Sequence, residues 1–222
     1  MSETSKSWRE WTDRNHAAVS DRYDQIAGFM ILLEWLLFLP AGFRRDAVSK
    51  IDLQRGDRVL EVGCGTGRNL AFLRERVGAS GHVYGVDLSA GMLARSRELC
   101  ARHGWTNVTL EHSDALYYSA PVPLDGVLFS LSYNTMPHHL AVLHHVMAQL
   151  RPGGRVVIMD AKVPRGRIGK ALLPFAIWLN EVTVLGNPHI HPWKDLAAVV
   201  DEFEMQERLF GAYYICRGRK HG

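Results

Sequence analysis

The stretch DRVLEVGCGTGRNLAFL, residues 57–73, decides the fold of this chain. An apolar run is followed by three glycines at alternate positions, Gly63, Gly65 and Gly67, and then by a pattern with helical spacing. A buried strand, a bare loop and a helix in this order are typical of an open α/β sheet, where ligands bind beyond the carboxyl ends of the strands. We therefore expect this loop to contact a ligand.

Short β-branched runs bounded by glycine continue the alternation of strands and helices. Strands are expected at 58–63, 82–87, 108–113, 126–131 and 155–160, helices at 68–77, 90–103 and 138–150, and two last strands at 203–210 and 212–220 around a turn at Gly211. This order predicts an α/β fold: a doubly wound, seven-stranded sheet, mostly parallel, with helices on both faces and a C-terminal antiparallel hairpin.

Length and composition limit the classes of protein to which this chain can belong. The chain has 222 residues, 47% of them apolar and 22% charged, which is typical of one compact soluble domain. Its net charge of +3 is too small to indicate nucleic acid as a partner. Three widely spaced cysteines and a polar N-terminus without a signal-peptide pattern favour the cytoplasm.

Three acidic residues lie in or near the C-terminal parts of the first three strands. The dinucleotide fingerprint G-x-G-x-x-G is not met, because the third glycine comes one position early. Instead Glu61 precedes the loop, Asp87 ends the second strand and Asp114 follows the third. Taken singly, each aspartate fits a helix cap better than a ligand. Together the three acids indicate a cationic, ribose-bearing adenine cofactor at one edge of the sheet.

The segments VLEVGCGTGRNL, GVDLSAGML, HSDAL and LRPGGRVVIMD resemble successive motifs of class I S-adenosylmethionine-dependent methyltransferases, and together they cover about residues 55–161. The resemblance implies a Rossmann-like fold with S-adenosylmethionine as cofactor and S-adenosylhomocysteine as product. It implies that Glu61 lies at the methionine part and that Asp87 holds the ribose hydroxyls. The residues expected to bind the cofactor are Tyr23, Glu61, Gly63, Cys64, Gly65, Gly67, Asp87, Leu88, Met92, Ser113, Asp114, Ala115 and Ser130.

The resemblance also divides the chain into a helical lid segment over 1–50 and a methyltransferase domain over 51–222. RYDQIA resembles a segment in which a tyrosine folds over the cofactor, although Tyr23 also fits an ordinary half-buried aromatic residue on a helix. The acceptor side is expected after the fourth strand, in SLSYNTMPHHL. The candidate catalytic residues are Tyr23, Tyr133, His138 and His139. No metal site is expected, since the His189/His191 pair has no further ligand at suitable spacing.

Two apolar segments, 28–43 and 171–179, suggest the kind of acceptor. The cations Arg165, Arg167 and Lys170 precede the second segment, as in helices that lie in an anionic membrane interface, although both segments also fit core helices. The chain is most similar to bacterial phosphatidylethanolamine N-methyltransferases and to ubiquinone and menaquinone methyltransferases. YNTM keeps only the asparagine of the arginine–asparagine pair typical of the quinone enzymes.

The sequence therefore predicts methyl transfer to a lipophilic acceptor, with a phospholipid amine first, by an enzyme in the cytoplasm or at the inner membrane surface. A quinone carbon, or a soluble metabolite or natural product, is the alternative. A nicotinamide oxidoreductase is disfavoured by the failed fingerprint, and a binding protein without turnover stays open.

Overall fold

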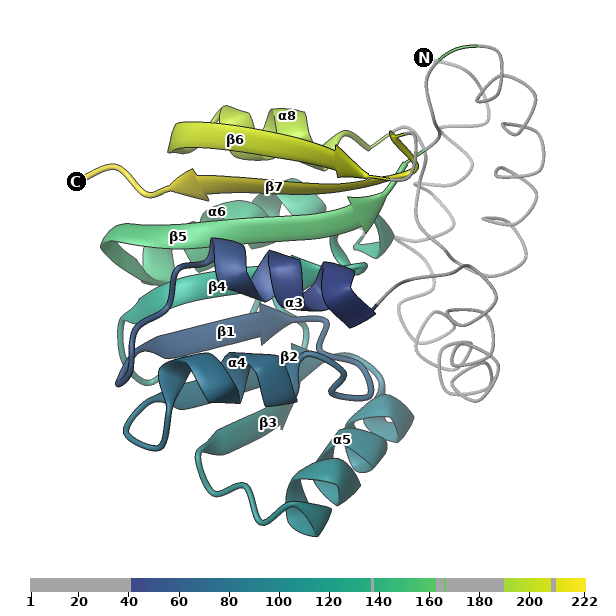
Figure 1. Cartoon of the computed structure of the whole chain (residues 1–222), viewed down its shortest axis with the longest axis vertical. Coiled ribbons are helices and arrows are strands. Elements are labelled where there is room, and N and C mark those ends of the chain that lie inside the picture. Colours follow the sequence, from purple (N-terminus) through teal and green to yellow (C-terminus); the bar gives the residue numbers. More distant parts are fainter. Residues whose placement is uncertain (1–40, 137, 163–165, 167–189, 209–210) are drawn as a thin grey trace.

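The computed structural model describes residues 41–136, 138–162, 166, 190–208 and 211–222. One seven-stranded sheet has the order β3-β2-β1-β4-β5-β7-β6 (Figure 1). The strands are β1 Arg58–Val62, β2 His82–Asp87, β3 Val108–His112, β4 Leu124–Ser130, β5 Leu150–Ala161, β6 Asp201–Arg208 and β7 Tyr213–Arg219. The helices are α3 Ala41–Lys50, α4 Leu70–Val77, α5 Ala90–Arg102, α6 His139–Gln149 and α8 Pro192–Ala197, with a 3-10 turn, η1, at Tyr133–Thr135.

The sheet is mostly parallel and ends in a hairpin. β1 pairs in parallel with β2 on one side and with β4 on the other, so the order of strands reverses at β1. β7 runs antiparallel to both β5 and β6. The expected fold class is confirmed, and the loop after β1 lies at the reversal point, where ligands bind in open α/β sheets.

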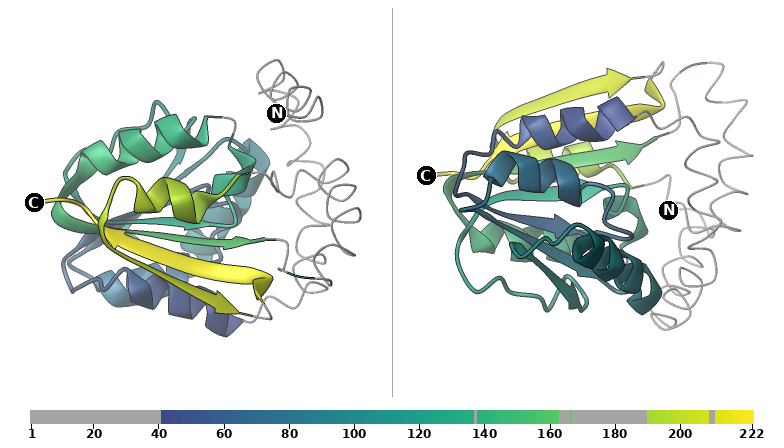
Figure 2. Two further views of the ribbon diagram at one scale, coloured as in Figure 1. Left: turned by 90° about the horizontal axis from the view of Figure 1, so that it is seen from above. Right: turned by 60° about the horizontal axis from the view of Figure 1, so that its bottom comes forward.

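Helices cover both faces of the sheet (Figure 2). The side chains of each strand alternate between two cores: Leu60 and Val62 pack on the side of α6 and α8, whereas Val59 packs on the side of α3, α4 and α5. The central strands β1, β2 and β4 are almost entirely buried because both of their faces are covered.

Helix α3 is the described end of the segment expected as a lid. Phe43, Ala47 and Val48 are buried in the core against the sheet, as is Ile51 just beyond the helix. At the neighbouring strand, a Cβ added at Gly126 would lie 2.4 Å from Cγ2 of Ile51, so only glycine permits this close approach. The expected lid residues 1–40, with Tyr23, lie outside the described residues.

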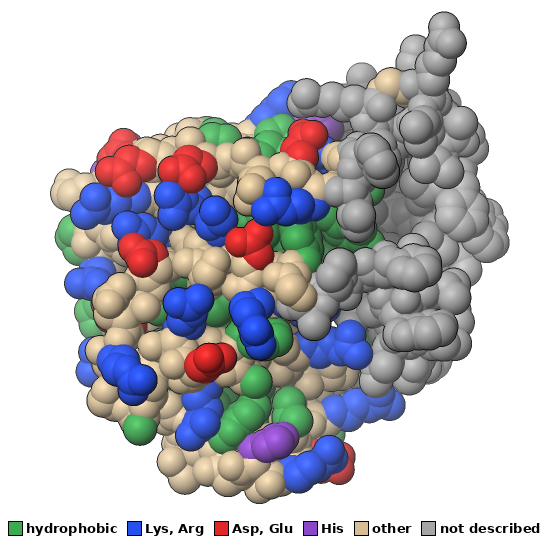
Figure 3. Space-filling model, viewed as in Figure 1, with side chains coloured by type: hydrophobic (Ala, Val, Ile, Leu, Met, Phe, Trp, Pro, Cys, Tyr) green, Lys and Arg blue, Asp and Glu red, His purple; other side chains and the backbone are tan. Residues whose placement is uncertain are grey.

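Charges of both signs are mixed on the face that carries α3, α4 and α5 (Figure 3). Several of them form exposed ion pairs, such as Arg155 with Asp52 and Arg217 with Glu204. Within the described parts of the chain, no helix has the length and apolar character needed to cross a membrane.

Candidate active site

The glycine loop after β1 is held close to β4 and β2. Gly63 and Gly65 have φ values of +70° and +54°, which favour glycine. A Cβ at Gly63 would lie 2.5 Å from Cβ of Ser132, whereas a Cβ at Gly65 would meet no atom of the described residues within 4 Å. Gly63 therefore permits packing against the segment after β4, and Gly65 leaves open space at the carboxyl edge of the sheet.

Glu61 lies beneath this loop as a buried acid, only 1% exposed. The Nδ2 atom of Asn69 donates to its Oε1 over 2.5 Å. Oε2 is also buried and has no hydrogen-bond partner among the described residues. Burial raises the pKa of Glu61 to about 7, while the Asn69 hydrogen bond and the nearby Arg44 charge act in the opposite direction. A buried carboxylate oxygen without a partner suits the ammonium group of an amino-acid ligand.

Arg44 of α3 also lies at this site. It is not among the site residues predicted from the sequence. The residue is only 8% exposed, and its Nη1 donates to Oγ of Ser130 over 3.1 Å and to Oδ1 of Asn69 over 3.4 Å. The residue therefore connects the end of β4 and the start of α4 with one buried cation. Its neighbour Arg45 is exposed, so nothing in the local sequence distinguishes the two arginines.

Asp87 connects the glycine loop to the end of β2. Its Oδ2 accepts the N–H of Gly65 over 2.7 Å, and its Oδ1 accepts the N–H of Ser89 over 2.9 Å. Ser89 in turn caps α5 by accepting from the N–H of Met92 over 3.0 Å. The acid expected to hold the ribose thus lies beside the glycine loop.

The residues expected at the adenine gather where β2 and β3 end. The N–H of Ser113 donates to the carbonyl of Asp87, and the ring of His112 bonds the carbonyl of Leu88. Asp114 accepts the N–H of Leu116 over 2.8 Å and so stabilises the turn that follows β3. Ala115 is buried at the sheet. Asp114 therefore stabilises a turn and does not cap a helix, because turn and irregular structure follow it over 115–123.

Two members of the expected cofactor set face the interior. The thiol of Cys64 is buried, and a Cβ at Gly85 would lie 3.0 Å from its sulfur. Burial also raises the pKa of this thiol. A Cβ at Gly67 would lie 2.8 Å from both Leu70 and Ser96. The Cys64 side chain therefore packs in the interior, and glycine is required at position 67 because Leu70 and Ser96 lie close to its Cα. Only the backbone atoms of these two residues are left for a ligand.

The candidate catalytic residues after β4 have different environments. Tyr133 is fully buried, and its hydroxyl donates to Oδ2 of Asp195 over 3.3 Å. Burial raises the pKa of Tyr133 far above its ordinary value. Nε2 of His139 lies 3.7 Å from the same Asp195 oxygen. His138 is exposed at the start of α6 and its side chain makes no capping hydrogen bond. The structure places Tyr133 in the core, where it contacts Phe129 and His139.

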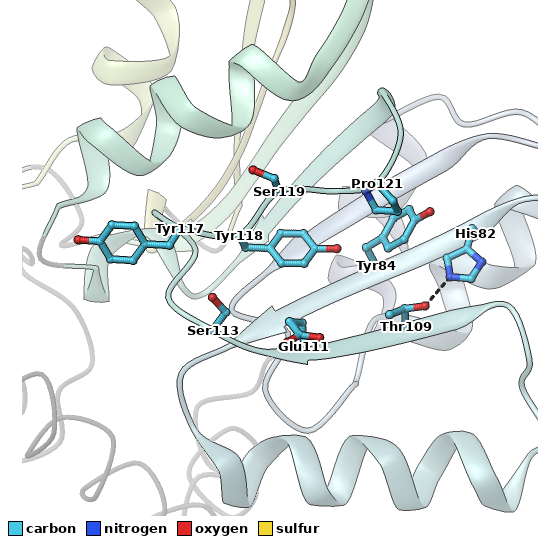
Figure 4. A pocket seen from close by; sticks show the side chains of 9 residues that line it. All are labelled: His82, Tyr84, Thr109, Glu111, Ser113, Tyr117, Tyr118, Ser119 and Pro121. Atoms are coloured by element: carbon cyan, nitrogen blue, oxygen red, sulfur yellow. Dashed lines mark hydrogen bonds between the residues drawn. The ribbon is translucent and has the colours of Figure 1, made fainter.

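A pocket of about 510 Å³ lies beside the expected adenine end, against β2 and β3 (Figure 4). His82 and Tyr84 come from β2, and Tyr118 from the loop after β3. Ser113, one of the residues expected to bind the cofactor, also lines this pocket. Among the described residues, no three His, Cys, Asp or Glu side chains are grouped so as to hold a metal ion.

The bare glycine loop, the unpartnered oxygen of Glu61 and the placement of Asp87 fit S-adenosylmethionine. Residues 59–154 match the family described as methyltransferase domain. These residues of the chain therefore carry a methyltransferase domain. Its fold is similar to that of an S-adenosylmethionine-dependent methyltransferase from Aquifex aeolicus, with a TM-score of 0.56 and 18% identity over 80% of this chain and 89% of that one.

Sequence relatives of this methyltransferase domain extend the comparison. A demethylmenaquinone methyltransferase of Anoxybacillus flavithermus is 32% identical over 165 residues, which are 72% of this chain and 65% of the relative. One from Geobacillus is 31% identical over 65% of this chain and 58% of the relative. The chain therefore spans less than two thirds of these curated relatives. Both relatives are named for a quinone, and neither is named for the phospholipid amine that was expected first.

Proposed function

We propose that the protein transfers a methyl group from S-adenosylmethionine to a ring carbon of a lipophilic quinol, an acceptor of the demethylmenaquinol class. The observation that carries this proposal is the 32% identity to a demethylmenaquinone methyltransferase over 165 residues. That alignment is longer than the family match at 59–154, so the likeness extends beyond the segment that supplies the glycine loop and the acids. The asparagine after β4, Asn134, is the residue that the chain shares with the pair typical of the quinone enzymes.

Each part of the cofactor would be bound by different residues of those described above. Glu61 and Arg44 would hold the ammonium and the carboxylate of the amino-acid part, since they place opposite charges at the end of β1. Asp87 would hold the ribose hydroxyls, and Leu88 and Met92 would flank the adenine. When bound, S-adenosylmethionine supplies an electrophilic methyl group on a sulfonium. The chain then has to orient the acceptor carbon in line with that methyl group and exclude water.

Contact with an anionic membrane is a further part of the proposal. It rests on the sequence alone, in which the basic residues Arg165, Arg167 and Lys170 precede the apolar segment 171–179. These residues all lie outside the described part of the chain. A lipophilic quinol dissolves in the membrane, so an enzyme that meets it there benefits from a basic and apolar surface segment.

The test is an acceptor assay with methyl-labelled S-adenosylmethionine. The purified protein is incubated separately with a chemically reduced 2-prenyl-1,4-naphthoquinone, with phosphatidylethanolamine vesicles and with a water-soluble metabolite extract. We expect label on a ring carbon of the naphthoquinol, identified by mass spectrometry, and less of it in a matched reaction with the Asp87→Ala variant at a cofactor concentration that does not saturate the wild type. Label on phosphatidylethanolamine alone, or in the aqueous phase alone, would replace the quinol with that acceptor.

A further inference from the structure

A second buried acid lies at the carboxyl edge of the sheet, outside the set that fits the cofactor. Asp160, near the end of β5, is 4% exposed. Its Oδ1 accepts the N–H of Ala161 over 2.8 Å, and its Oδ2 accepts the N–H of Asn134 over 3.3 Å. The side-chain Nδ2 of Asn134 donates to the carbonyl of Ala161 over 3.4 Å, beside the carboxylate. Burial raises the pKa of Asp160 to about 7, with the hydrogen bonds to the carboxylate opposing the shift.

Two buried polar atoms beside this acid have no hydrogen-bond partner among the described residues. One is Oδ1 of Asn134, an acceptor, on a residue that is 8% exposed. The other is the hydroxyl of Tyr214, a donor, which is fully buried. Tyr214 pairs with Asp160 across β5 and β7, so the two side chains are on the same face of the sheet. Unsatisfied buried polar atoms are costly, which indicates a ligand that can both donate and accept a hydrogen bond.

This cluster adjoins the loop that fits the cofactor. Asn134 lies two residues after Ser132, whose Oγ donates to the carbonyl of Val62 over 2.6 Å and whose Cβ lies against Gly63. In the sheet, Ser130 pairs with Met159, one residue before Asp160. The cluster is therefore one strand away from the Arg44–Ser130 contact, at the same edge of the sheet.

We propose that Asp160 is a catalytic residue that accepts the proton of the acceptor's ring hydroxyl, while Asn134 and Tyr214 hold that hydroxyl in place. This inference rests on the proposed function, because only an oxygen or carbon acceptor needs such a base. A hydroxyl group matches the cluster, since it donates to Oδ1 of Asn134 or to the carboxylate and accepts from the hydroxyl of Tyr214.

The proposed step conserves protons and electrons. The O–H bond breaks and its proton goes to the Asp160 carboxylate, while the oxygen electron pair forms a C=O bond and raises the electron density at the neighbouring ring carbon. That carbon forms the new bond to the methyl group, and the S–CH₃ bond breaks with both electrons remaining on sulfur. The ring C–H proton then leaves to water, and Asp160 returns its proton to the oxygen. One proton is released in total.

The other titratable groups around Asp160 are protonated or already lie against a partner of their own. They are Tyr214 and Cys216 of β7, Tyr133 of η1, Asp195 of α8, His139 of α6, and Lys162 just beyond β5. Burial raises the pKa of Tyr214 and of Cys216, so both stay protonated. Asp195 accepts from the Tyr133 hydroxyl, and Lys162 forms an ion pair with Glu207.

The experiment compares the pH dependence of kcat for naphthoquinol methylation in the wild type, Asp160→Asn and Asp125→Asn. In the wild type we expect kcat to rise with pH up to about 7 and then level off. Asp160→Asn should lower kcat by about 10²-fold or more. It should also replace the plateau with a rate that keeps rising with pH, because the acceptor hydroxyl must then ionise unaided. Its affinity for S-adenosylhomocysteine, measured by calorimetry, should stay within threefold of the wild type.

Asp125→Asn is the matched control. Asp125 lies at the opposite end of β4, where it accepts the N–H of Arg58 over 2.7 Å and pairs with Arg151. It should keep the wild-type pH profile, which separates the loss of a base from the loss of a structural carboxylate.

Four outcomes would count against the proposal. A wild-type kcat independent of pH between 5.5 and 8, or an Asp160→Asn variant that keeps the wild-type rate and profile, would overturn it and leave the quinol function intact. If Asp160→Asn does not fold, Asp160→Glu should keep the rise to a plateau, and a profile without that rise would be contrary evidence. A wild type that methylates no quinol removes the proposed function and this inference together.

Discussion

The Nδ2 atom of Asn69 donates to Oε1 of Glu61 over 2.5 Å, while Oε2 of the same carboxylate is buried without a partner among the described residues. Asn69 thus fixes the orientation of the acid and leaves one oxygen for a ligand. Because Asn69 also accepts from Arg44, the buried acid and the buried arginine are connected through one amide side chain. This arrangement determines how the site should respond to pH and to substitution.

The affinity for S-adenosylhomocysteine should increase as the pH rises through about 7. The ligand's ammonium group favours the ionised form of Glu61, and burial raises the pKa of that acid to about 7 in the free protein. Below this pH the affinity should fall by up to about tenfold per unit. Calorimetry between pH 5.5 and 8.5 measures the effect. Glu61→Gln should bind weakly with little pH dependence, and an unchanged slope in that variant would assign the titration to another group.

Arg44→Met should weaken S-adenosylhomocysteine binding by about 1–3 kcal/mol, the scale for hydrogen bonds to charged groups. The reason is the loss of the buried cation that would face the ligand carboxylate. Binding of 5′-methylthioadenosine, which keeps the adenosine and lacks the amino-acid part, should be nearly unaffected. Equal losses for the two ligands would mean that Arg44 acts only by holding Ser130 and Asn69 in place.

Asp87→Ala should weaken both ligands, by about 1–3 kcal/mol each. The substitution removes the group expected to bind the ribose, which both ligands contain, and it also frees the N–H groups of Gly65 and Ser89. Calorimetric titration with the two ligands measures the losses. Full retention of 5′-methylthioadenosine affinity would show that the ribose is held elsewhere.

The free energy of unfolding of the ligand-free protein should fall as the pH rises from about 4 to 7. Glu61 and Asp160 have pKa values near 7 in the folded state, against ordinary values of 4.5 and 3.8. The folded state therefore binds more protons in this range, and its stability is lost as both acids ionise. The loss should be on the order of 3 kcal/mol for each acid.

Urea unfolding of the wild type and of the Glu61→Gln/Asp160→Asn double variant measures this loss. The double variant should show a flatter dependence on pH. Equal slopes in the two proteins would contradict the assignment.

Binding to anionic vesicles should depend on the basic residues that precede the 171–179 segment. Changing Arg165, Arg167 and Lys170 together to Glu reverses the charge expected to meet lipid phosphates. Co-sedimentation with vesicles should fall to background, while S-adenosylhomocysteine affinity stays unchanged. If the wild type does not sediment with vesicles, or the variant still does, the proposed membrane contact is wrong.

Much of the fold follows from local sequence patterns. The alternation of β-branched runs with helical segments located every strand of the sheet to within a few residues, except that β5 begins earlier, at Leu150, because the chain pairs with β4 before the RPGG turn. The glycine loop and Asp87 were found from their spacing alone, since the end of a strand and the start of the next helix are close in sequence.

The sequence by itself determined the sheet, the loop and the acids at the ends of neighbouring strands, because these features repeat at short and regular spacing. Only the tertiary structure decided which polar residues meet there. Arg44 precedes β1 by fourteen positions and reaches the site because α3 packs on the sheet, while Tyr133, expected beside the acceptor, turns into the core. Asp160 and Asn134 are brought together by the pairing of β5 with β4. Such contacts depend on packing between distant segments, which a local pattern does not encode.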